Sequence, residues 1–339
     1  WGRRSERAAA MTAVVERPAR GFGGGRLGLA LTGVLGLLLV ALLLSLGLGA
    51  LEIAPGRIVA ILGSALLGEA GTETQSAAPL AVRPPRAARA LPGRRRPGPA
   101  RAGLPRVALA VAVGAGLATA GAALQGLFRN PLADPQLIGI SGGAAMAASG
   151  TIVLGGPLLA ALPAVLVPWA LPTAAFLGAL TVTGLIYAFS MRRGGLDLAT
   201  LLLAGVALNA IAMSTLGLFT YMSDDQQLRD LNLWMLGSLA GAPWAQVLPV
   251  LPLIALAVFG IVAMARPLNA LLLGEAEAFH IGFRVERVKR QLVVCAALAA
   301  GAAVALTGII GFVGLMVPHL VRLMIGPDHR ALLPVAALL

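Results

Sequence analysis

The sequence has one cysteine and one lysine, and only 12% of its 339 residues are charged. A single thiol, Cys295, excludes an intrachain disulfide and a multi-cysteine metal site, and its apolar surroundings indicate a small core residue. The lysine, Lys289, lies in "RVKRQ" rather than in a Gly-Lys-Ser/Thr sequence. The chain therefore has no P-loop, and any ATP-driven step requires a separate ATPase.

The chain is also poor in groups that could form a catalytic or metal site. Its three histidines, His280, His319 and His329, are too scattered for a zinc motif such as H-E-x-x-H. No Ser/His/Asp arrangement and no pair of carboxylates stands out, which disfavours an intramembrane protease or another hydrolase. We expect no catalytic residue, no metal ligand and no permanently bound cofactor.

Hydrophobic residues make up 58% of the chain and the mean hydropathy is +0.88, so the sequence predicts an all-α, polytopic transmembrane helical bundle. The first apolar run, 27–50, is too long for a signal peptide. Short alternating segments typical of a β-barrel do not occur. The predicted spans are 27–50, 104–128, 142–163, 169–190, 198–221, 246–266 and 291–316.

The net charge of +12 is concentrated in the first third of the chain. Residues 1–106 hold 15 Arg and 5 acidic residues, whereas residues 107–339 hold 11 basic and 9 acidic residues. Such basic tracts set topology or contact anionic lipid, and without interleaved aromatic residues they do not indicate nucleic-acid binding. The arginines before the first span, after the fourth and after the sixth share one side if the N-terminus is cytoplasmic.

Three segments do not fit a simple arrangement of membrane spans and short loops. The stretch 83–106 holds eight arginines on the side where few are expected, so we interpret it as a disordered insertion or a reading-frame error rather than a functional basic loop. We take 71–103 as an atypical Arg/Pro-rich insertion into the transmembrane domain. Met11 is a plausible start, which makes 1–10 upstream translation or an artificial addition within a cytoplasmic arm, 1–26. The chain stops inside an apolar run, so we expect the transmembrane domain, 27–339, to lack its last spans.

Polar residues inside the spans are few. No acidic or basic residue lies in the middle of a predicted span, which disfavours an ion-coupled transporter. Asn209, deep in the fifth span, either faces a pathway or hydrogen-bonds a neighbouring helix, and Gln125 at the end of the second span has the same two interpretations.

Two segments between spans carry more information than the spans do. In "QGLFRNPLADPQLIGISGGA", 125–144, Pro131 and Pro135 interrupt the helix, which is tolerable only at an aqueous end or beside a cavity. The loop 267–290 predicts two short helices along the membrane, with a break at Gly282, and such a pair is suited to dock a partner or simply to lie at the interface.

Five motifs together resemble the FecCD-type permeases of type II ABC importers for haem, ferric siderophores and cobalamin. They are "RVALAVAVGAGLATAGAALQGLFRNPLADPQLIGISGGA" (106–144), "LLLAGVALNA" (201–210), "LRDLNLWMLGSLAG" (228–241), "GEAEAFHIGF" (274–283) and "TGIIGFVGLMVPHLVRLMIGPDHRALLP" (307–334). The resemblance implies a homodimer in the bacterial cytoplasmic membrane with roughly ten spans per subunit. It also implies a central pathway, two ATPases and an external substrate-binding protein.

The resemblance assigns roles to particular residues. Gate or pathway candidates are Gln125, Asn130, Pro131, Leu132 and Asn209. The region 267–290 corresponds to the coupling helices of the family. Its ATPase-docking candidates are Glu275, Glu277, Gly282, Arg284 and Arg287. Candidates for contact with the binding protein are Asp224, Asp225, Arg229 and Asp230.

The motifs are most similar to those of haem permeases, so haem is the expected cargo, with a ferric siderophore second and cobalamin third. Haem would be a transported substrate, and ATP would be used by the partner subunit. Two alternatives come from other classes of protein. Intramembrane charges or inverted repeats would favour a secondary transporter. The absence of a copurifying ATPase would favour a membrane scaffold.

Overall fold

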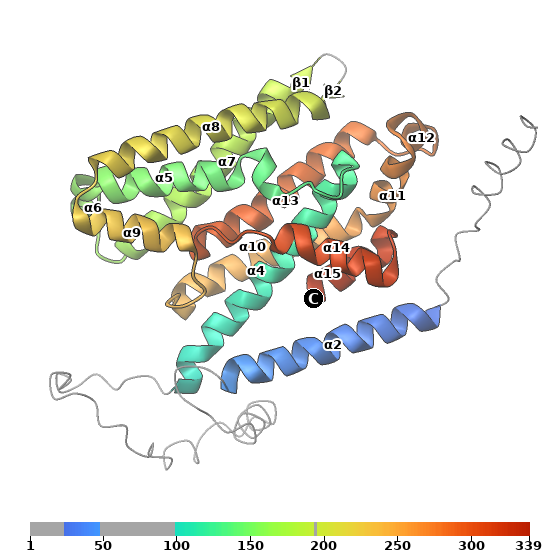
Figure 1. Cartoon of the computed structure of the whole chain (residues 1–339), viewed down its shortest axis with the longest axis horizontal. Coiled ribbons are helices and arrows are strands. Elements are labelled where there is room, and N and C mark those ends of the chain that lie inside the picture. The colour runs from blue at the N-terminus through green and yellow to red at the C-terminus, as the bar shows by residue number, and fades with distance from the viewer. Residues whose placement is uncertain (1–23, 48–98, 193–194) are drawn as a thin grey trace, which may run out of the picture.

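The computed structural model describes residues 24–47, 99–192 and 195–339, and this part of the chain is almost entirely helical (Figure 1). The long helices are α2 (Gly24–Gly47), α4 (Pro99–Phe128), α7 (Val167–Ser190), α8 (Leu198–Met222), α10 (Trp244–Ala263) and α13 (Val285–Thr307). The shorter helices are η1 (Pro135–Ile138), α5 (Ile140–Leu154), α6 (Gly156–Ala161), α9 (Asp225–Leu236), α11 (Ala265–Leu273), α12 (Glu275–His280), α14 (Val313–Ile325) and α15 (His329–Leu338).

Two expectations fall largely outside these residues. The N-terminal arm, 1–26, is described only from Gly24, where α2 begins. The Arg-rich segment, 71–103, is described only from Pro99, and its last residues form the first turn of α4.

Five helices in the described part of the chain are long and apolar enough to cross a membrane, which confirms a polytopic helical fold. They are 103–128, 167–190, 198–222, 244–263 and 285–307. The first and last have 61% and 67% of their most apolar window buried, against 22–33% for the other three. Helices α4 and α13 therefore form the centre of the bundle, and α7, α8 and α10 present more of their surface to the surroundings.

The predicted span 142–163 is wrong in both its limits and its continuity. Helix α5 starts at Ile140 and ends at Leu154, and α6 follows from Gly156 as a separate short helix. Pro157 at the start of α6 has no N–H for the carbonyl four residues earlier, so the hydrogen-bond ladder cannot run through it. Hydropathy could not show this break because the residues on both sides are apolar.

The predicted span 291–316 is also wrong, because it covers a helix, a break and the start of another helix. Helix α13 ends at Thr307, and Gly308 has a φ of 71°, which favours glycine. A side chain at Gly308 would overlap the carbonyl oxygen of Trp234, at the end of α9. The chain then turns and continues as α14, so the apolar run combines the second part of the long helix α13 with the start of a separate, shorter helix.

Non-helical backbone lies deep in the bundle at the start of α5. Leu117 is 11 residues, or about 17 Å, from the end of α4, and it lines a small cavity together with Asp134, Pro135 and Ile140. The segment that follows α4 therefore runs back along that helix before α5 begins. Backbone groups at such a depth need partners inside the protein, because lipid offers none.

Glycines allow the central helices to approach to backbone contact. A side chain at Gly121 of α4 would overlap the carbonyl oxygen of Gly314 in α14, and one at Gly143 of α5 would overlap that of Gly178 in α7. These close approaches are typical of membrane helices, whose association depends on tight packing rather than on the hydrophobic effect.

We expect Gly121→Ala to destabilise the bundle by about 1–3 kcal/mol, because the added methyl group meets backbone that has no rotamer to change. Gly114→Ala in the same helix is the matched control, since nothing lies within 4 Å of the added atom. Thermal unfolding in detergent measures both. Equal unfolding temperatures for the two variants would contradict the proposed α4–α14 contact.

Candidate functional site

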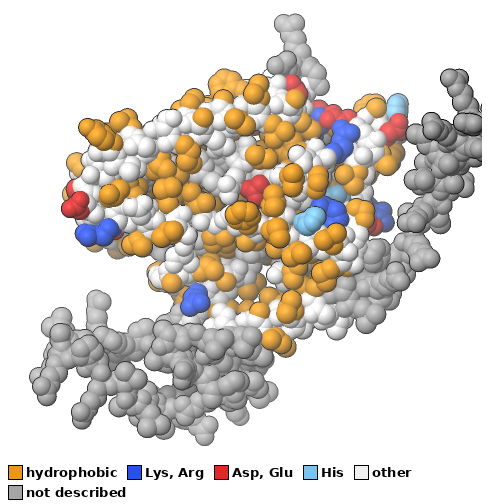
Figure 2. Space-filling view, in the orientation of Figure 1, with side chains coloured by type: hydrophobic (Ala, Val, Ile, Leu, Met, Phe, Trp, Pro, Cys, Tyr) orange, Lys and Arg blue, Asp and Glu red, His pale blue; other side chains and the backbone are white. Residues whose placement is uncertain are grey.

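The molecule has two polar ends separated by an apolar belt. At one end, here called the hairpin end, lie α11, α12 and a two-stranded hairpin of β1 (Met191–Arg192) and β2 (Gly195–Leu196) (Figure 1). At the other, here called the α9 end, lie α6 and the start of α9. Most charged side chains on the face in Figure 2 lie at these two ends, and the side chains between them are mainly hydrophobic, apart from one acidic group near the middle and one basic group at the lower edge.

The turn after α4, residues 129–132, is exposed at the hairpin end, and we call it the gate turn after the role that the resemblance predicts for it. Arg129 has a φ of 50°, and the N–H of Asn130 donates to the carbonyl of Gln125 over 3.1 Å, which closes the helix with a Schellman-type bond. The side chain of Asn130 accepts from the N–H of Leu132 at 2.9 Å. Leu132 is 69% exposed, so an apolar side chain projects from a turn held by local hydrogen bonds.

Two of the predicted pathway residues are engaged in hydrogen bonds between segments. Asn209 of α8 donates from Nδ2 to the carbonyl of Gln136 in η1 at 3.0 Å. Its interpretation as a link to a neighbouring segment therefore fits the structure. Gln125 is 3% exposed, donates from Nε2 to the carbonyl of Leu315 at 3.3 Å and accepts at Oε1 from Arg322 at 2.9 Å. It ties α4 to α14 beneath the gate turn.

A second polar group lies beside Gln125, where α11 meets the start of α15. Asn269 donates to Asp328 at 2.6 Å, and its Oδ1 lies 3.0 Å from the backbone nitrogen of His329 and 2.8 Å from Nδ1 of the same residue. His329 is 2% exposed. Burial, then the positive charge of Arg322, lowers the pKa of His329 to about 4, against a smaller opposite effect of Asp328.

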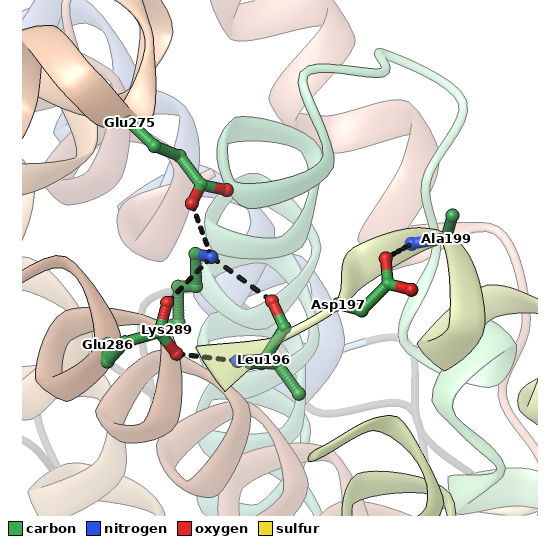
Figure 3. A network of polar contacts seen from close by, with 6 residues as sticks. All are labelled: Leu196, Asp197, Ala199, Glu275, Glu286 and Lys289. Atoms are coloured by element: carbon green, nitrogen blue, oxygen red, sulfur yellow. Dashed lines mark hydrogen bonds and ion pairs between the residues drawn. The ribbon is translucent and has the colours of Figure 1, made fainter. Parts of the chain in front are cut away.

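Lys289, in the first turns of α13, is the centre of a network at the hairpin end (Figure 3). Its Nζ lies 2.6 Å from Glu275 of α12, 3.0 Å from Glu286 and 3.1 Å from the carbonyl of Leu196 in β2. Glu286 also accepts from the N–H of Leu196 at 2.7 Å. The buried ammonium therefore joins α12, α13 and the hairpin.

The docking candidates divide into two groups in the structure. Glu275 is committed to Lys289 and serves the internal network. Glu277, Gly282, Arg284 and Arg287 are exposed around an apolar surface, here called the α11–α12 patch. The patch consists of Leu272, Leu273, Phe279 and Ile281, all exposed.

The predicted coupling region is divided differently from the expectation. Gly274, with a φ of 131°, separates α11 from α12, and Gly282, with a φ of 101°, lies in the turn that leads into α13. The segment thus has two short helices, as expected, but the break between them is at Gly274, and the basic turn already belongs to α13.

At the α9 end, the candidates for contact with a binding protein form one local unit. Asp224 caps α9, accepting from the N–H groups of Gln226 and Gln227. Gln226 in turn accepts from Arg229 at 2.8 Å and donates to Asp230 at 3.1 Å. With Asp225 also exposed, the unit presents three carboxylates and one guanidinium to solvent.

Within the described residues, no group of three or more His, Cys, Asp or Glu side chains could hold a metal ion. The Lys289 network and the Arg322–His329 neighbourhood were not identified from the sequence. A signal existed for the first, because the only lysine follows Glu286 by three residues on one helix face. For the second, Gln125 lies 197 residues from Arg322 and Asn269 lies 60 residues from His329, too far in the sequence to suggest a contact.

Known proteins similar to this chain are membrane transporters. Residues 99–339 match the FecCD transport family. The hemin transport system permease protein HmuU of Yersinia pestis is 49% identical over 235 residues, which is 69% of this chain and 69% of that protein. The cobalamin import system permease protein BtuC of Halobacterium salinarum is 44% identical over 69% of this chain and 61% of its own length.

A solved structure agrees with the fold. It is an inward-facing conformation of an ABC transporter assigned to the metal-chelate type, with a TM-score of 0.70 and 26% sequence identity. The match covers 92% of this chain and 86% of the other.

We expect Lys289→Met to destabilise the protein by about 1–3 kcal/mol, because it leaves two carboxylates and a carbonyl without their shared partner. The loss stays below that of a fully buried pair, since the Glu275 and Glu286 side chains are 40% and 46% exposed and remain hydrated. Arg290→Met, at an exposed position of the same helix, is the control. Thermal unfolding in detergent compares them, and an unchanged Lys289→Met variant would contradict a structural role for the network.

We expect acid to destabilise the protein through His329. Below about pH 6.5 the unfolded histidine binds a proton, but the folded one stays neutral until about pH 4. Stability is therefore lost as pH falls through this window, by at most about 3 kcal/mol. The unfolding temperature of His329→Gln should fall less between pH 7 and pH 5 than that of the wild type, while His280→Gln, at an exposed site, keeps the wild-type slope. Parallel slopes for all three proteins would refute the assignment.

Proposed function

The chain belongs to the FecCD transport family and is the permease subunit of an ABC importer, and on this premise we propose that its cargo is haem. The observation that carries the cargo is the 49% identity to a hemin permease. The cobalamin permease at 44% identity makes cobalamin the alternative to be tested, together with a ferric siderophore.

The apolar helices support transport without ion coupling. Helices α7, α8 and α10 contain no acidic or basic residue. A coupling ion needs a group that binds and releases it at membrane depth, and these helices offer no charged one. A large apolar cargo can instead pass a smooth surface, where strong ligation would slow its release.

Energy would then come from a separate ATPase bound at the hairpin end. The α11–α12 patch combines exposed apolar side chains with the charges of Glu277, Arg284 and Arg287, a composition that suits insertion into a groove on a partner. Lys289 would make the patch rigid by fixing α12 to α13 and to the hairpin. A docked ATPase could therefore move these elements as one body.

The remaining partners follow from the two polar ends. The charged unit at the start of α9, with Asp224, Asp225, Arg229 and Asp230, would receive the substrate-binding protein. Two copies of the chain would enclose the pathway in the bacterial inner membrane, with the N-terminus and hairpin end in the cytoplasm. The gate turn, with Asn130, Pro131 and Leu132, would then close the cytoplasmic end of the pathway.

We propose the same division of the chain as the sequence predicts. It consists of a cytoplasmic arm, 1–26, and a transmembrane domain, 27–339, which contains the insertion 71–103 and the coupling region 267–290. In this scheme Gln125 and Asn209 support the pathway through hydrogen bonds rather than contact the cargo.

Reconstitution tests the cargo directly. The permease and its ATPase are placed in liposomes with ATP inside, and the binding protein is supplied outside with haem, a ferric siderophore or cobalamin. We expect haem to accumulate in the lumen only with ATP and the binding protein. Accumulation of cobalamin or the siderophore, but not of haem, would show that haem is not the cargo. It would still support an ATP-driven importer.

Two controls separate the other classes. Uptake that needs an ion gradient but no ATP would indicate a secondary transporter. Failure of any ATPase to copurify, together with no uptake, would indicate a scaffold.

A further inference from the structure

Five residues from four segments meet between the α11–α12 patch and the gate turn. They are Gln125 of α4, Asn269 of α11, Arg322 of α14, Asp328 before α15 and His329 of α15, and we call them the polar cluster. On one side the cluster holds α11, which leads through Gly274 into α12. On the other side it holds Gln125, whose carbonyl accepts from Asn130 in the gate turn.

We propose that the polar cluster transmits movement of the docked α11–α12 segment to the gate turn, with Arg322 and His329 as positioning residues. This inference rests on the proposed function, because it takes α11–α12 as the ATPase-docking segment and residues 129–132 as the gate.

The first step connects α11 to α15. One side chain, Asn269, donates to Asp328 at 2.6 Å and accepts from the N–H of His329 at 3.0 Å. The same oxygen lies 2.8 Å from Nδ1 of His329. Hydrogen bonds are directional and weaken steeply with misalignment. A shift of α11 must therefore carry the start of α15 with it or break all three contacts.

The second step connects His329 to Arg322. Because Oδ1 of Asn269 is an acceptor, Nδ1 of His329 carries the proton and Nε2 has a free lone pair. Nε2 of His329 and Nη1 of Arg322 are both buried, and neither has a hydrogen-bond partner. One is an acceptor and the other a donor, and the charge of Arg322 acts on the imidazole. The pair can engage in one state of the cycle and separate in another.

The third step connects Arg322 to the gate turn. Its Nη2 donates to Oε1 of Gln125 at 2.9 Å, and the carbonyl of Gln125 receives the N–H of Asn130 at 3.1 Å. Gly126 of α4 allows His329 to pack closely against this end of α4, because a side chain at Gly126 would lie 2.6 Å from Nε2 of His329. Movement of Arg322 therefore acts on the residue that closes α4 and starts the gate turn.

The test measures gate movement separately from transport. Leu132→Cys is introduced with Cys295→Ala, so that the thiol in the gate turn is the only one, and the full chain is reconstituted with its ATPase in liposomes. Maleimide labelling is then timed without nucleotide and in the vanadate-trapped state. We expect the labelling rate to change by about fivefold or more between the two states, the range of ordinary coupling between sites.

The variants separate transmission from folding. With His329→Ala or Arg322→Met the two labelling rates should converge, although the ATPase still copurifies and binds ATP. His329→Gln places an amide near the position of Nε2 and should restore part of the difference. His319→Ala, at an exposed position on α14, is the matched control and should behave as the parent.

The outcomes are distinguishable from those of the cargo test. A full labelling difference in both His329→Ala and Arg322→Met would overturn the transmission role, while wild-type haem uptake would leave the proposed function intact. No difference in the parent would overturn the gate assignment and the inference with it. If His329→Ala does not assemble, Arg322→Lys, which keeps the charge but not the forked donor, gives the same comparison and should reduce the difference.

Discussion

The fold depends on satisfying backbone polar groups where helices are interrupted inside an apolar bundle. Lipid cannot hydrogen-bond an exposed N–H or C=O, so each interruption must find its partners in the protein. At η1 the partners are Asp134, which receives the N–H of Gln136, and Asn209, which donates to the carbonyl of Gln136. At the end of α13, the N–H of Ser238 donates to the carbonyl of Thr307. The glycines at α4, α8 and α14 matter for the same reason, because only close approach brings these partners within reach.

The hairpin end shows how polar contacts organise a surface around this apolar frame. Lys289 joins three segments that are separated in the sequence, and the polar cluster joins four more. Lys289 is buried and Arg322 is partly buried, and a buried positive charge is strongly destabilising unless it is paired. The two arrangements differ in how fully their polar atoms are hydrogen-bonded. Lys289 has three partners, whereas Arg322 and His329 each have one buried nitrogen without a partner. The Lys289 network is therefore suited to hold its segments rigidly together, and the polar cluster is suited to alternate between two hydrogen-bonding arrangements.

Hydropathy predicted most of the crossing helices but not the helices that turn back. The ranges 169–190, 198–221 and 246–266 agree with α7, α8 and α10 within a few residues, because each is a single apolar run with polar ends. The ranges 142–163 and 291–316 failed, because a broken apolar run has the same composition as a continuous one.

The site residues divide in a similar way. Asn130, Pro131 and Leu132 lie in an exposed turn, as Pro131 and Pro135 indicated. Gln125 and Glu275, in contrast, have internal partners that no local pattern could reveal.

By itself, the sequence determined that this protein is an all-helical membrane protein, that it contains no P-loop sequence and no metal-binding sequence motif, and which family it resembles. These follow from composition and from motifs that are contiguous in the chain. Only the tertiary structure decided where the apolar runs break, which polar residues face one another, and which charges remain at the surface. The physical reason is that these contacts join residues far apart in the sequence, such as Leu196 with Lys289, 93 residues apart, and Gln125 with Arg322, 197 residues apart. Periodicity along one helix contains no information about a partner on another.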